Sequence, residues 1–219
     1  MKTHKPLWPT TPLPQYTNYW IGDDDMMAEF TLSDIERIRT TKQELVNRLQ
    51  TFWMTTEKVG SSKSWFVSGG CIGSLLRGEE VNDIDVYFFS QAEAERVTRL
   101  FTQDDSYMHE VAEYNDKYRD VPNPGGKLIT ENAITLKSGV QIITKHYGYP
   151  EQIRATFDFA HCTPYFDSRD QKLYISKQQY DLNMNKILLV NNSSTFGIHR
   201  ENKFIGKGWR YGDPQTKPV

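Results

Sequence analysis

Apolar residues recur at helical spacing in the first long stretch of the chain that lacks proline. Ile35, Ile38, Leu45, Leu49 and Phe52 would share one face of a helix. They follow Ser33-Asp34-Ile35-Glu36, which has the form of a capping box. The pattern therefore predicts a helix over residues 34–55. A second capping box, Ser90-Gln91-Ala92-Glu93, predicts a helix that ends near Phe101.

Short runs of β-branched and aromatic residues predict the strands, at residues 65–67, 84–89, 133–136, 140–144 and 172–176. The two runs that flank Lys137-Ser138-Gly139 have a hairpin signature. Further helices are predicted at residues 72–76, 150–157, 178–190 and 199–209, and residues 104–127 read as a polar loop. This order predicts an α/β (α+β) fold, with a small mixed sheet flanked by helices.

The chain divides into four segments by pattern. Residues 1–30 contain Pro6, Pro9, Pro12 and Pro14, whose spacing forbids a helix and predicts an extended N-terminal arm. Residues 31–60 hold the first helix, and residues 61–170 hold the predicted core domain. Residues 171–219 form a C-terminal extension with a basic helix, which we expect to pack on the core.

Composition limits the classes of function. The 219 residues suffice for one domain, and the formal net charge of −2 confines any nucleic-acid contact to a local patch. No apolar run approaches the 18 residues of a membrane-spanning helix, so we expect no membrane association. Cys71 and Cys162 cannot form a disulfide framework and suit a reducing cytoplasm. No feature indicates an obligate protein partner.

The segment from Gly69 to Asp85 combines three elements that together indicate phosphate chemistry. Gly69 and Gly70 end a strand and open a helix, where bare backbone N–H groups can approach phosphate oxygens. Asp83 and Asp85 follow on the next strand, so both side chains leave the same face. Two carboxylates this close repel each other unless a cation lies between them, and Mg²⁺ is the natural partner. This arrangement suits metal-assisted phosphoryl or nucleotidyl transfer.

This segment also resembles a known family. It is similar to the head domain of CCA-adding enzymes and bacterial poly(A) polymerases. The shared pattern is Gly-Gly, two residues, Gly73-Ser74, Leu-Leu, one residue, Gly, four residues and Asp-x-Asp. These enzymes belong to the DNA polymerase beta nucleotidyltransferase superfamily. They usually carry Arg-Asp where this chain has Gly73-Ser74, whereas a Gly-Ser pair is common in the phosphate-binding turn of the wider superfamily. Asn132–Thr135, Gln141–Ile143 and Phe157–Phe159 are similar to nucleotidyltransferase-like proteins of large DNA viruses and phages.

The resemblance implies a nucleotidyltransferase fold and a site that binds a nucleoside triphosphate with Mg²⁺ or Mn²⁺. Asp83 and Asp85 would bind the metal, while Gly69, Gly70, Gly73 and Ser74 would contact the nucleotide. It also implies a third carboxylate on a strand beside Asp-x-Asp, where this chain has Gln141. Either Asp158 supplies that acid as a metal-binding catalytic residue, or the site has two carboxylates and is weak or inactive. A third reading makes Asp158 a capping residue.

Two other groups of residues are candidate sites. Arg200, Lys203 and Lys207 recur at spacings of three and four, so they would share one helix face. That face would neutralise a triphosphate or an RNA backbone, or it is an ordinary solvated basic face. His161-Cys162 lacks the second ligand pair of a zinc site and is predicted to be packed core.

The leading hypothesis is a metal-dependent nucleotidyltransferase that transfers a nucleoside monophosphate from a nucleoside triphosphate to a hydroxyl acceptor. RNA such as tRNA ranks first as acceptor by resemblance, ahead of a protein or a small molecule. One alternative is a catalytically silent nucleotide- or RNA-binding protein that retains the fold. Another is a toxin-like modifier of tRNA or protein. The expected location is the cytoplasm, and the host cytoplasm for a viral or phage protein.

Overall fold

The computed structural model describes residues 20–21, 30–113, 127–195 and 197–212. The helices are α1 (Leu32–Lys58), α2 (Gly70–Leu76), α3 (Gln91–Gln103), α4 (Asp105–Met108), α5 (Pro150–Arg154), the 3₁₀ helix η2 (Ala160–Cys162), α6 (Lys177–Met184) and α7 (Ile198–Gly206). The strands are β1 (Trp20–Ile21), β2 (Trp65–Ser68), β3 (Ile84–Phe88), β4 (Ala133–Thr135), β5 (Val140–Tyr147), β6 (Tyr165–Asp167), β7 (Lys172–Tyr174), β8 (Ile187–Leu188) and β9 (Arg210–Tyr211).

Within the described ranges, seven strands form one mixed sheet in the order β1-β7-β6-β2-β3-β5-β4. Every neighbouring pair is antiparallel except β3 and β5, which run parallel. The predicted mixed sheet and the hairpin of β4 and β5 are thus confirmed. The sheet takes β1 from the predicted arm and β7 from the predicted C-terminal extension, while residues 1–19 and 22–29 of the arm lie outside the described residues. Strands β8 and β9 form a separate parallel pair.

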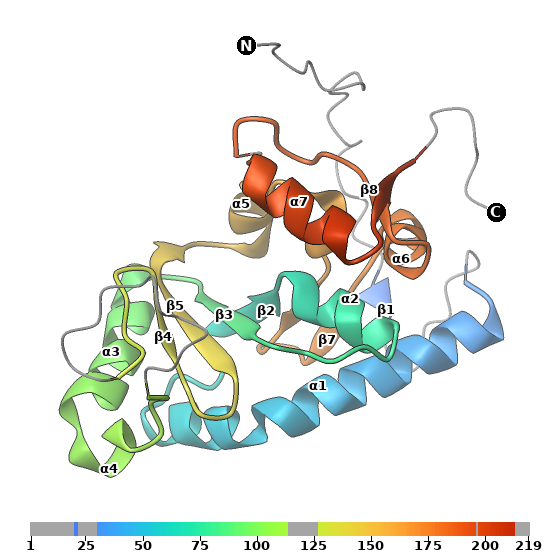
Figure 1. Ribbon diagram of the computed structural model, residues 1–219. Coiled ribbons are helices and arrows are strands. Elements are labelled where there is room, and N and C mark those ends of the chain that lie inside the picture. The colour runs from blue at the N-terminus through green and yellow to red at the C-terminus, as the bar shows by residue number, and fades with distance from the viewer. Residues whose placement is uncertain (1–19, 22–29, 114–126, 196, 213–219) are drawn as a thin grey trace, which may run out of the picture.

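Helices cover both faces of the sheet (Figure 1). Helix α1 runs along one face, where its apolar stripe packs with α2, α3 and the strands into the main core. On the opposite face lie α5 and α7, and Phe66, Tyr87, Ile153 and Tyr165 form a second cluster there. A third cluster, built on Phe159, Cys162, Leu188 and Trp209, attaches the C-terminal residues to the body. In the described residues no helix combines the length and apolarity needed to cross a bilayer.

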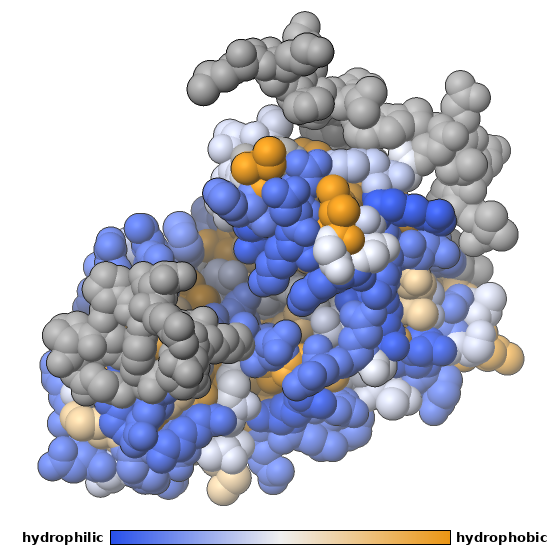
Figure 2. All heavy atoms as spheres, viewed as in Figure 1, coloured by the Kyte–Doolittle hydropathy of each residue, from blue (hydrophilic) through white to orange (hydrophobic). Residues whose placement is uncertain are grey.

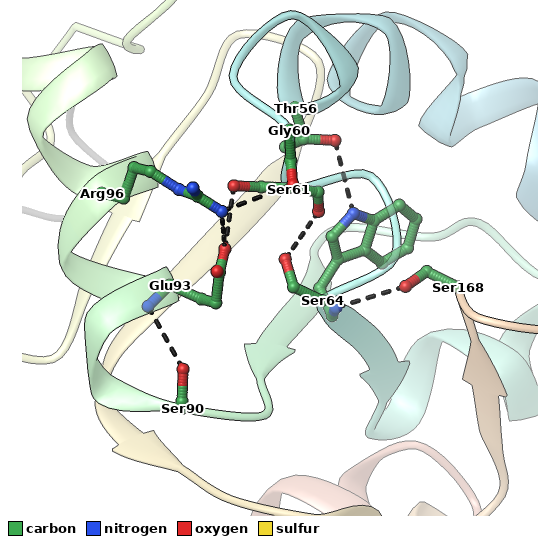
Figure 3. Close-up of polar contacts among 9 residues, drawn as sticks. Thr56, Gly60, Ser61, Ser64, Ser90, Glu93, Arg96 and Ser168 are labelled. Carbon is green, nitrogen blue, oxygen red and sulfur yellow. Dashed lines mark hydrogen bonds and ion pairs between the residues drawn. The ribbon is translucent and has the colours of Figure 1, made fainter.

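Polar contacts fix the junction where α1 gives way to β2 (Figure 3). Trp65 is fully buried, and its backbone N–H donates to the Ser168 hydroxyl at 3.2 Å. The Glu93 carboxylate accepts hydrogen bonds from the Ser61 hydroxyl at 2.9 Å and from Arg96 at 2.5 Å. The Glu93 contacts connect the first turn of α3 to the loop that precedes β2, and the Ser168 contact ties the start of β2 to the residue that follows β6.

Several predicted boundaries were wrong. Helix α1 begins at Leu32 and is capped by Thr31, whose hydroxyl accepts from the Asp34 N–H, so Ser33 is not the cap. Part of the predicted loop at 104–127 forms α4, and residues 114–126 lie outside the described residues. Helix α5 is shorter than predicted, and α6 is shorter because the chain turns into β8. Helix α7 ends at Gly206 and leaves Trp209 outside the helix.

Candidate active site

Asp85 lies against the turn formed by Gly69 and Gly70 at the start of α2, which we call the glycine corner. Gly69 precedes α2 with φ of 107°, a left-handed conformation that favours glycine. A Cβ atom added at Gly69 would lie 3.0 Å from Asp85 Oδ2. The two segments meet because β2 and β3 are neighbouring antiparallel strands, and α2 with its following loop connects them. The structure therefore brings together the predicted carboxylate and the predicted phosphate-binding turn.

The environment of Asp85 opposes its ionisation. Burial raises the pKa of the Asp85 carboxyl, the negative charge of Asp83 raises it further, and the pKa reaches about 6. Arg200 and Lys203 act in the opposite direction and lower this pKa. Carboxylate repulsion and nearby cations thus coexist at one position, as expected for a site that binds a cation together with an anionic ligand.

A cavity of about 270 Å³ opens over the glycine corner. Gly69, Gly70 and Asp85 line it on the sheet side, and Arg200 of α7 lines it from the C-terminal segment. The remaining walls are Tyr87, His146, Ile153, Thr156, Phe157, Asp158, Cys162 and Thr195. Segments far apart in sequence therefore converge on one hollow between the sheet and the helices α5 and α7.

Asp158 reaches this cavity in an ion pair. Its side chain is 4% exposed, and Arg200 donates to it from Nε to Oδ2 at 2.5 Å and from Nη2 to Oδ1 at 3.3 Å. The Phe159 N–H also donates to Asp158 Oδ1, at 3.0 Å. In the part of the chain that the structure describes, no three His, Cys, Asp or Glu side chains are grouped as a metal site. Metal binding by Asp83, Asp85 and Asp158 stays a prediction.

Gln141 occupies the position expected for a third acid. In the parallel pairing of β3 with β5, Gln141 lies directly opposite Asp85, so both side chains share one face of the sheet. The Gln141 amide donates from Nε2 to Thr135 Oγ1 at 3.3 Å. The side-chain oxygen is a neutral acceptor, which binds a metal only weakly and cannot act as a general base.

The structure separates the remaining predicted residues. Gly73 and Ser74 lie within α2 and are not part of the cavity lining. A Cβ atom added at Gly73 would lie 2.0 Å from Asn183 Oδ1, so the glycine allows α2 and α6 to pack closely. The charges of Arg200 and Lys203 lower the pKa of Asp85, whereas Lys207 is the C-cap residue of α7 and is exposed. A nucleotide contact by Gly73, Ser74 or Lys207 stays a prediction.

Several cavity residues are not among those predicted from the sequence. Tyr87 follows Asp85 by two positions on β3, and strand alternation would have placed it on the same face. His146 carries no comparable signal, and Phe157 entered only through the resemblance of Phe157–Phe159 to viral and phage proteins, because the positions of both residues depend on where β5 and α5 end. His161 and Cys162 are buried, as predicted for packed core, and Cys162 also forms part of the cavity wall.

Comparison with known proteins identifies the family. Residues 40–186 match the family model described as Gad2, Gabija anti-defense 2 family protein. The chain belongs to this family. It is 26% identical over 152 residues to Gabija anti-defense 2 of Bacillus phage SPbetaL7, which covers 68% of this chain and 34% of that protein. The chain thus spans about a third of the curated relative it matches, and the resemblance to phage proteins is confirmed.

Solved structures of CCA-adding enzymes share the fold. The complex of a CCA-adding enzyme with CTP has a TM-score of 0.50 and 16% identity, over 82% of this chain and 42% of that chain. The Thermotoga maritima CCA-adding enzyme complexed with tRNA has a TM-score of 0.47 and 15% identity, over 85% of this chain and 41% of the other. The likeness concerns the fold alone, and the predicted nucleotidyltransferase fold is confirmed.

Proposed function

We propose that this chain is a metal-dependent nucleotidyltransferase that moves a nucleoside monophosphate from a nucleoside triphosphate to a hydroxyl acceptor. One observation carries the proposal: Asp85 packs on the Gly69 corner in a cavity that also contains Arg200. The cavity thus combines the Asp85 carboxylate, which could bind a metal, with open backbone at Gly69 that phosphate oxygens could approach. It also contains Arg200, whose charge could offset that of the phosphates. The same three features support a nucleoside triphosphate as ligand.

The residues present suit one divalent cation. Asp83 directly precedes β3 and is not part of the cavity lining, but its charge raises the pKa of Asp85. A cation bound by both carboxylates would relieve that repulsion. Mg²⁺ needs only one or two carboxylates when substrate phosphates complete its coordination. Asp83 and Asp85 would hold Mg²⁺ or Mn²⁺, with the Gln141 oxygen as a weak neighbouring donor. When bound, the cation neutralises phosphate charge and lowers the pKa of the attacking hydroxyl.

The other side chains bind and orient the nucleotide. Gly69 and Gly70 leave room for phosphate oxygens at the backbone, and Arg200 with Lys203 offsets their negative charge. Tyr87 and Phe157, whose ring centroids lie 5.9 Å apart, provide an apolar wall for the sugar or base. RNA ranks first as the acceptor, and a protein hydroxyl is the other macromolecular acceptor.

Label transfer tests the enzymatic proposal. The protein is incubated with each labelled nucleoside triphosphate, Mg²⁺ or Mn²⁺, and total RNA or host protein. We expect a labelled product whose size identifies the acceptor, and we expect none from the double variant Asp83→Asn/Asp85→Asn. The matched control Asp170→Asn removes an acidic side chain outside the cavity lining and should leave transfer unchanged.

Gln141 favours a second candidate function, a catalytically silent nucleotide-binding protein. With an amide opposite Asp85, the site lacks the third acid that the family resemblance implies. Nucleotide binding without transfer in every mixture would support this reading and contradict the enzyme. Restoring an acid with Gln141→Asp would then be expected to introduce transfer.

Family membership supports a role in phage counter-defence, and we propose that this chain acts there in the host cytoplasm. The curated phage relative is named for Gabija anti-defense. Plating a phage on a host that carries Gabija, with and without the expressed chain, tests that role. If Asp83→Asn/Asp85→Asn protects the phage as well as the unmodified chain does, counter-defence does not require the proposed site.

A further inference from the structure

The pair of Asp158 and Arg200 has the geometry of a fixed support. Asp158 is almost completely buried, whereas the Arg200 side chain is 55% exposed. Two guanidinium nitrogens, Nε and Nη2, donate to the carboxylate, and the Phe159 N–H donates to Oδ1. A buried carboxylate bonded in this way holds the arginine in one orientation.

The backbone that carries Asp158 is also fixed. Its carbonyl oxygen accepts from the Asn191 N–H at 2.7 Å, and the Asn191 side-chain amide donates to the carbonyl oxygens of Arg154 at 2.9 Å and Phe157 at 2.8 Å. Asn191 therefore binds the chain on both sides of Phe157. The backbone on both sides of the Asp158 carboxylate is consequently held by hydrogen bonds from Asn191.

Helix α7 is also held by contacts of its C-terminal half and of the residues that follow it. Phe204 packs edge-on against His161 with ring centroids 4.6 Å apart, and Trp209 packs against the same imidazole at 3.8 Å. The Tyr211 hydroxyl donates to Glu201 Oε1 at 2.7 Å. Arg200 thus lines the cavity from a helix that is packed on the body, and its guanidinium donates to the buried Asp158 carboxylate.

Arg200 retains hydrogen-bonding capacity toward a ligand. Its Nη1 has no hydrogen-bond acceptor in the described part of the chain, and the residue lines the same cavity as Gly69, Gly70 and Asp85. The guanidinium fork bonds phosphate oxygens with defined geometry when one edge is already fixed. Asp158 oxygens, in contrast, are already occupied by Arg200 and the Phe159 N–H.

We infer that Asp158 is a positioning residue that orients Arg200 toward the phosphates of a bound nucleoside triphosphate, and that Asp158 does not ligate the metal. The inference rests on the proposed nucleotide site. It assigns the carboxylate a role through Arg200, so the two side chains form one functional unit. Asp83 and Asp85 would then be the only carboxylates among the proposed metal ligands.

Equilibrium binding of ATP, measured by calorimetry on the full chain in EDTA and in Mg²⁺, tests this assignment. We expect Asp158→Asn and Arg200→Lys each to weaken ATP binding in EDTA about tenfold, or about 1.4 kcal/mol. The double variant should bind no more weakly than either single variant, because both remove the same contact. Inorganic triphosphate should compete with ATP on the unmodified chain and compete less well on each variant.

The Mg²⁺ concentration needed for ATP binding distinguishes a carboxylate that ligates the metal from one that positions Arg200. Asp158→Asn should leave the half-saturating Mg²⁺ concentration unchanged, whereas Asp83→Asn should raise it. Asp158→Glu retains the charge and should recover part of the lost affinity. Asp181→Asn, which breaks the ion pair with Lys177 on α6, is the matched control and should bind ATP normally. Thermal unfolding of each variant confirms that a folded protein is measured, and Arg200→Lys carries the test if Asp158→Asn does not fold.

A raised Mg²⁺ requirement in Asp158→Asn, or additive losses in the double variant, would overturn the inference and make Asp158 a metal ligand. Normal ATP binding in both Asp158→Asn and Arg200→Lys would overturn it while leaving the proposed site intact, provided that Asp83→Asn still raises the Mg²⁺ requirement. If the unmodified chain binds no nucleoside triphosphate, the proposed function itself fails, and the inference fails with it.

Discussion

Asp85 should destabilise the metal-free protein at neutral pH. Its pKa of about 6 in the folded chain lies above the ordinary value of 3.8, because of burial and the charge of Asp83. A raised carboxyl pKa contributes stability below about pH 4, and this contribution is lost as pH rises through about 6. Asp85→Asn should therefore raise the free energy of unfolding at pH 7 by about 2–3 kcal/mol. Urea unfolding without metal from pH 4 to pH 8 measures this.

The gain in Asp85→Asn should vanish near pH 4, where the native carboxyl is already protonated. A gain of the same size at pH 4 and pH 7 would mean that the effect is steric and unrelated to charge. Asp170→Asn, at an exposed position, serves as the control. Added Mg²⁺ should stabilise the unmodified chain but not Asp85→Asn, if Asp85 binds the ion.

His161 should produce the opposite pH dependence. Both ring nitrogens are buried without a hydrogen-bond partner among the described residues, and the imidazole packs against Phe159, Phe204 and Trp209. Burial first, and then the charges of Arg77 and Arg200, lower its pKa from 6.5 to about 3. A lowered histidine pKa contributes stability above pH 6.5, and this is lost as pH falls toward 3.

Replacing His161 by phenylalanine, whose ring does not ionise, should remove the loss of stability at low pH. At pH 5, His161→Phe is expected to be about 2 kcal/mol more stable than the unmodified chain, relative to their difference at pH 7.5. Denaturant unfolding at the two pH values measures the comparison. Because Asp85 responds in the opposite direction over part of this range, the test is best made in the Asp85→Asn background. Equal pH slopes with and without His161 would contradict a buried neutral imidazole.

At the scale of elements, Gly73 fixes how closely α2 approaches α6. A Cβ atom there would meet Asn183 Oδ1 at 2.0 Å, and the Asn183 amide is itself held by the carbonyl oxygens of His161 and Gln179, each at 2.9 Å. We expect Gly73→Ala to destabilise the protein by about 1–3 kcal/mol, because the site cannot relax without breaking these bonds. The folded variant should bind ATP normally, since Gly73 is not part of the cavity lining.

Gly206→Ala is the matched control, because a Cβ atom at Gly206 has no neighbour within 4 Å. Differential scanning calorimetry gives the stability change, and ATP titration gives the affinity. Weaker ATP binding by a stably folded Gly73→Ala would instead support the nucleotide contact predicted for this residue.

Elements with their own periodicity could be predicted, and elements made by tertiary pairing could not. Helix α1 and strands β2 and β3 have clear patterns, and each was predicted within a few residues. The two-residue strands β8 and β9 have no pattern of their own and arise from pairing between segments more than 20 residues apart. The cap of α1 was misplaced because Thr31 and Ser33 are both competent capping residues, and only the structure shows which one accepts from Asp34.

The candidate site divides in the same way. Asp85 and Gly69 are separated by one short helix and a loop, so the spacing in the sequence sufficed to predict that they meet. The contact between Asp158 and Arg200 joins residues 42 positions apart on different elements. Sequence indicated that each belonged to the site, but it gave no reason to pair them. Sequence did not assign His146 or Phe157 to the site, because their place in the cavity depends on where β5 and α5 end.

At the scale of the whole molecule, the site depends on how the C-terminal segment docks. The sheet has its main core on the side of α1, whereas α7 is attached by the third cluster around Phe159 and Trp209. The outward surface of α7 includes Ile198 and Ile205, which are 62% and 49% exposed, and Figure 2 shows apolar spots over this helix on an otherwise largely hydrophilic face. The helix that carries Arg200 therefore relies on one small aromatic cluster and a few polar contacts.

Trp209→Ala should release α7 without unfolding the sheet. Trp209 is 5% exposed and packs against His161, Phe204 and the Arg77 guanidinium, which lies 4.9 Å from its ring, so truncation should weaken docking by about 3–5 kcal/mol. Hydrogen exchange followed by mass spectrometry should show faster exchange in α7, with β2 and β3 still protected. ATP affinity should fall together with the protection of α7, because Arg200 leaves the cavity. Ile205→Ala, which removes an exposed side chain of the same helix, should change neither quantity. Simultaneous loss of protection in α7 and in the sheet would instead show that the two unfold as one cooperative unit.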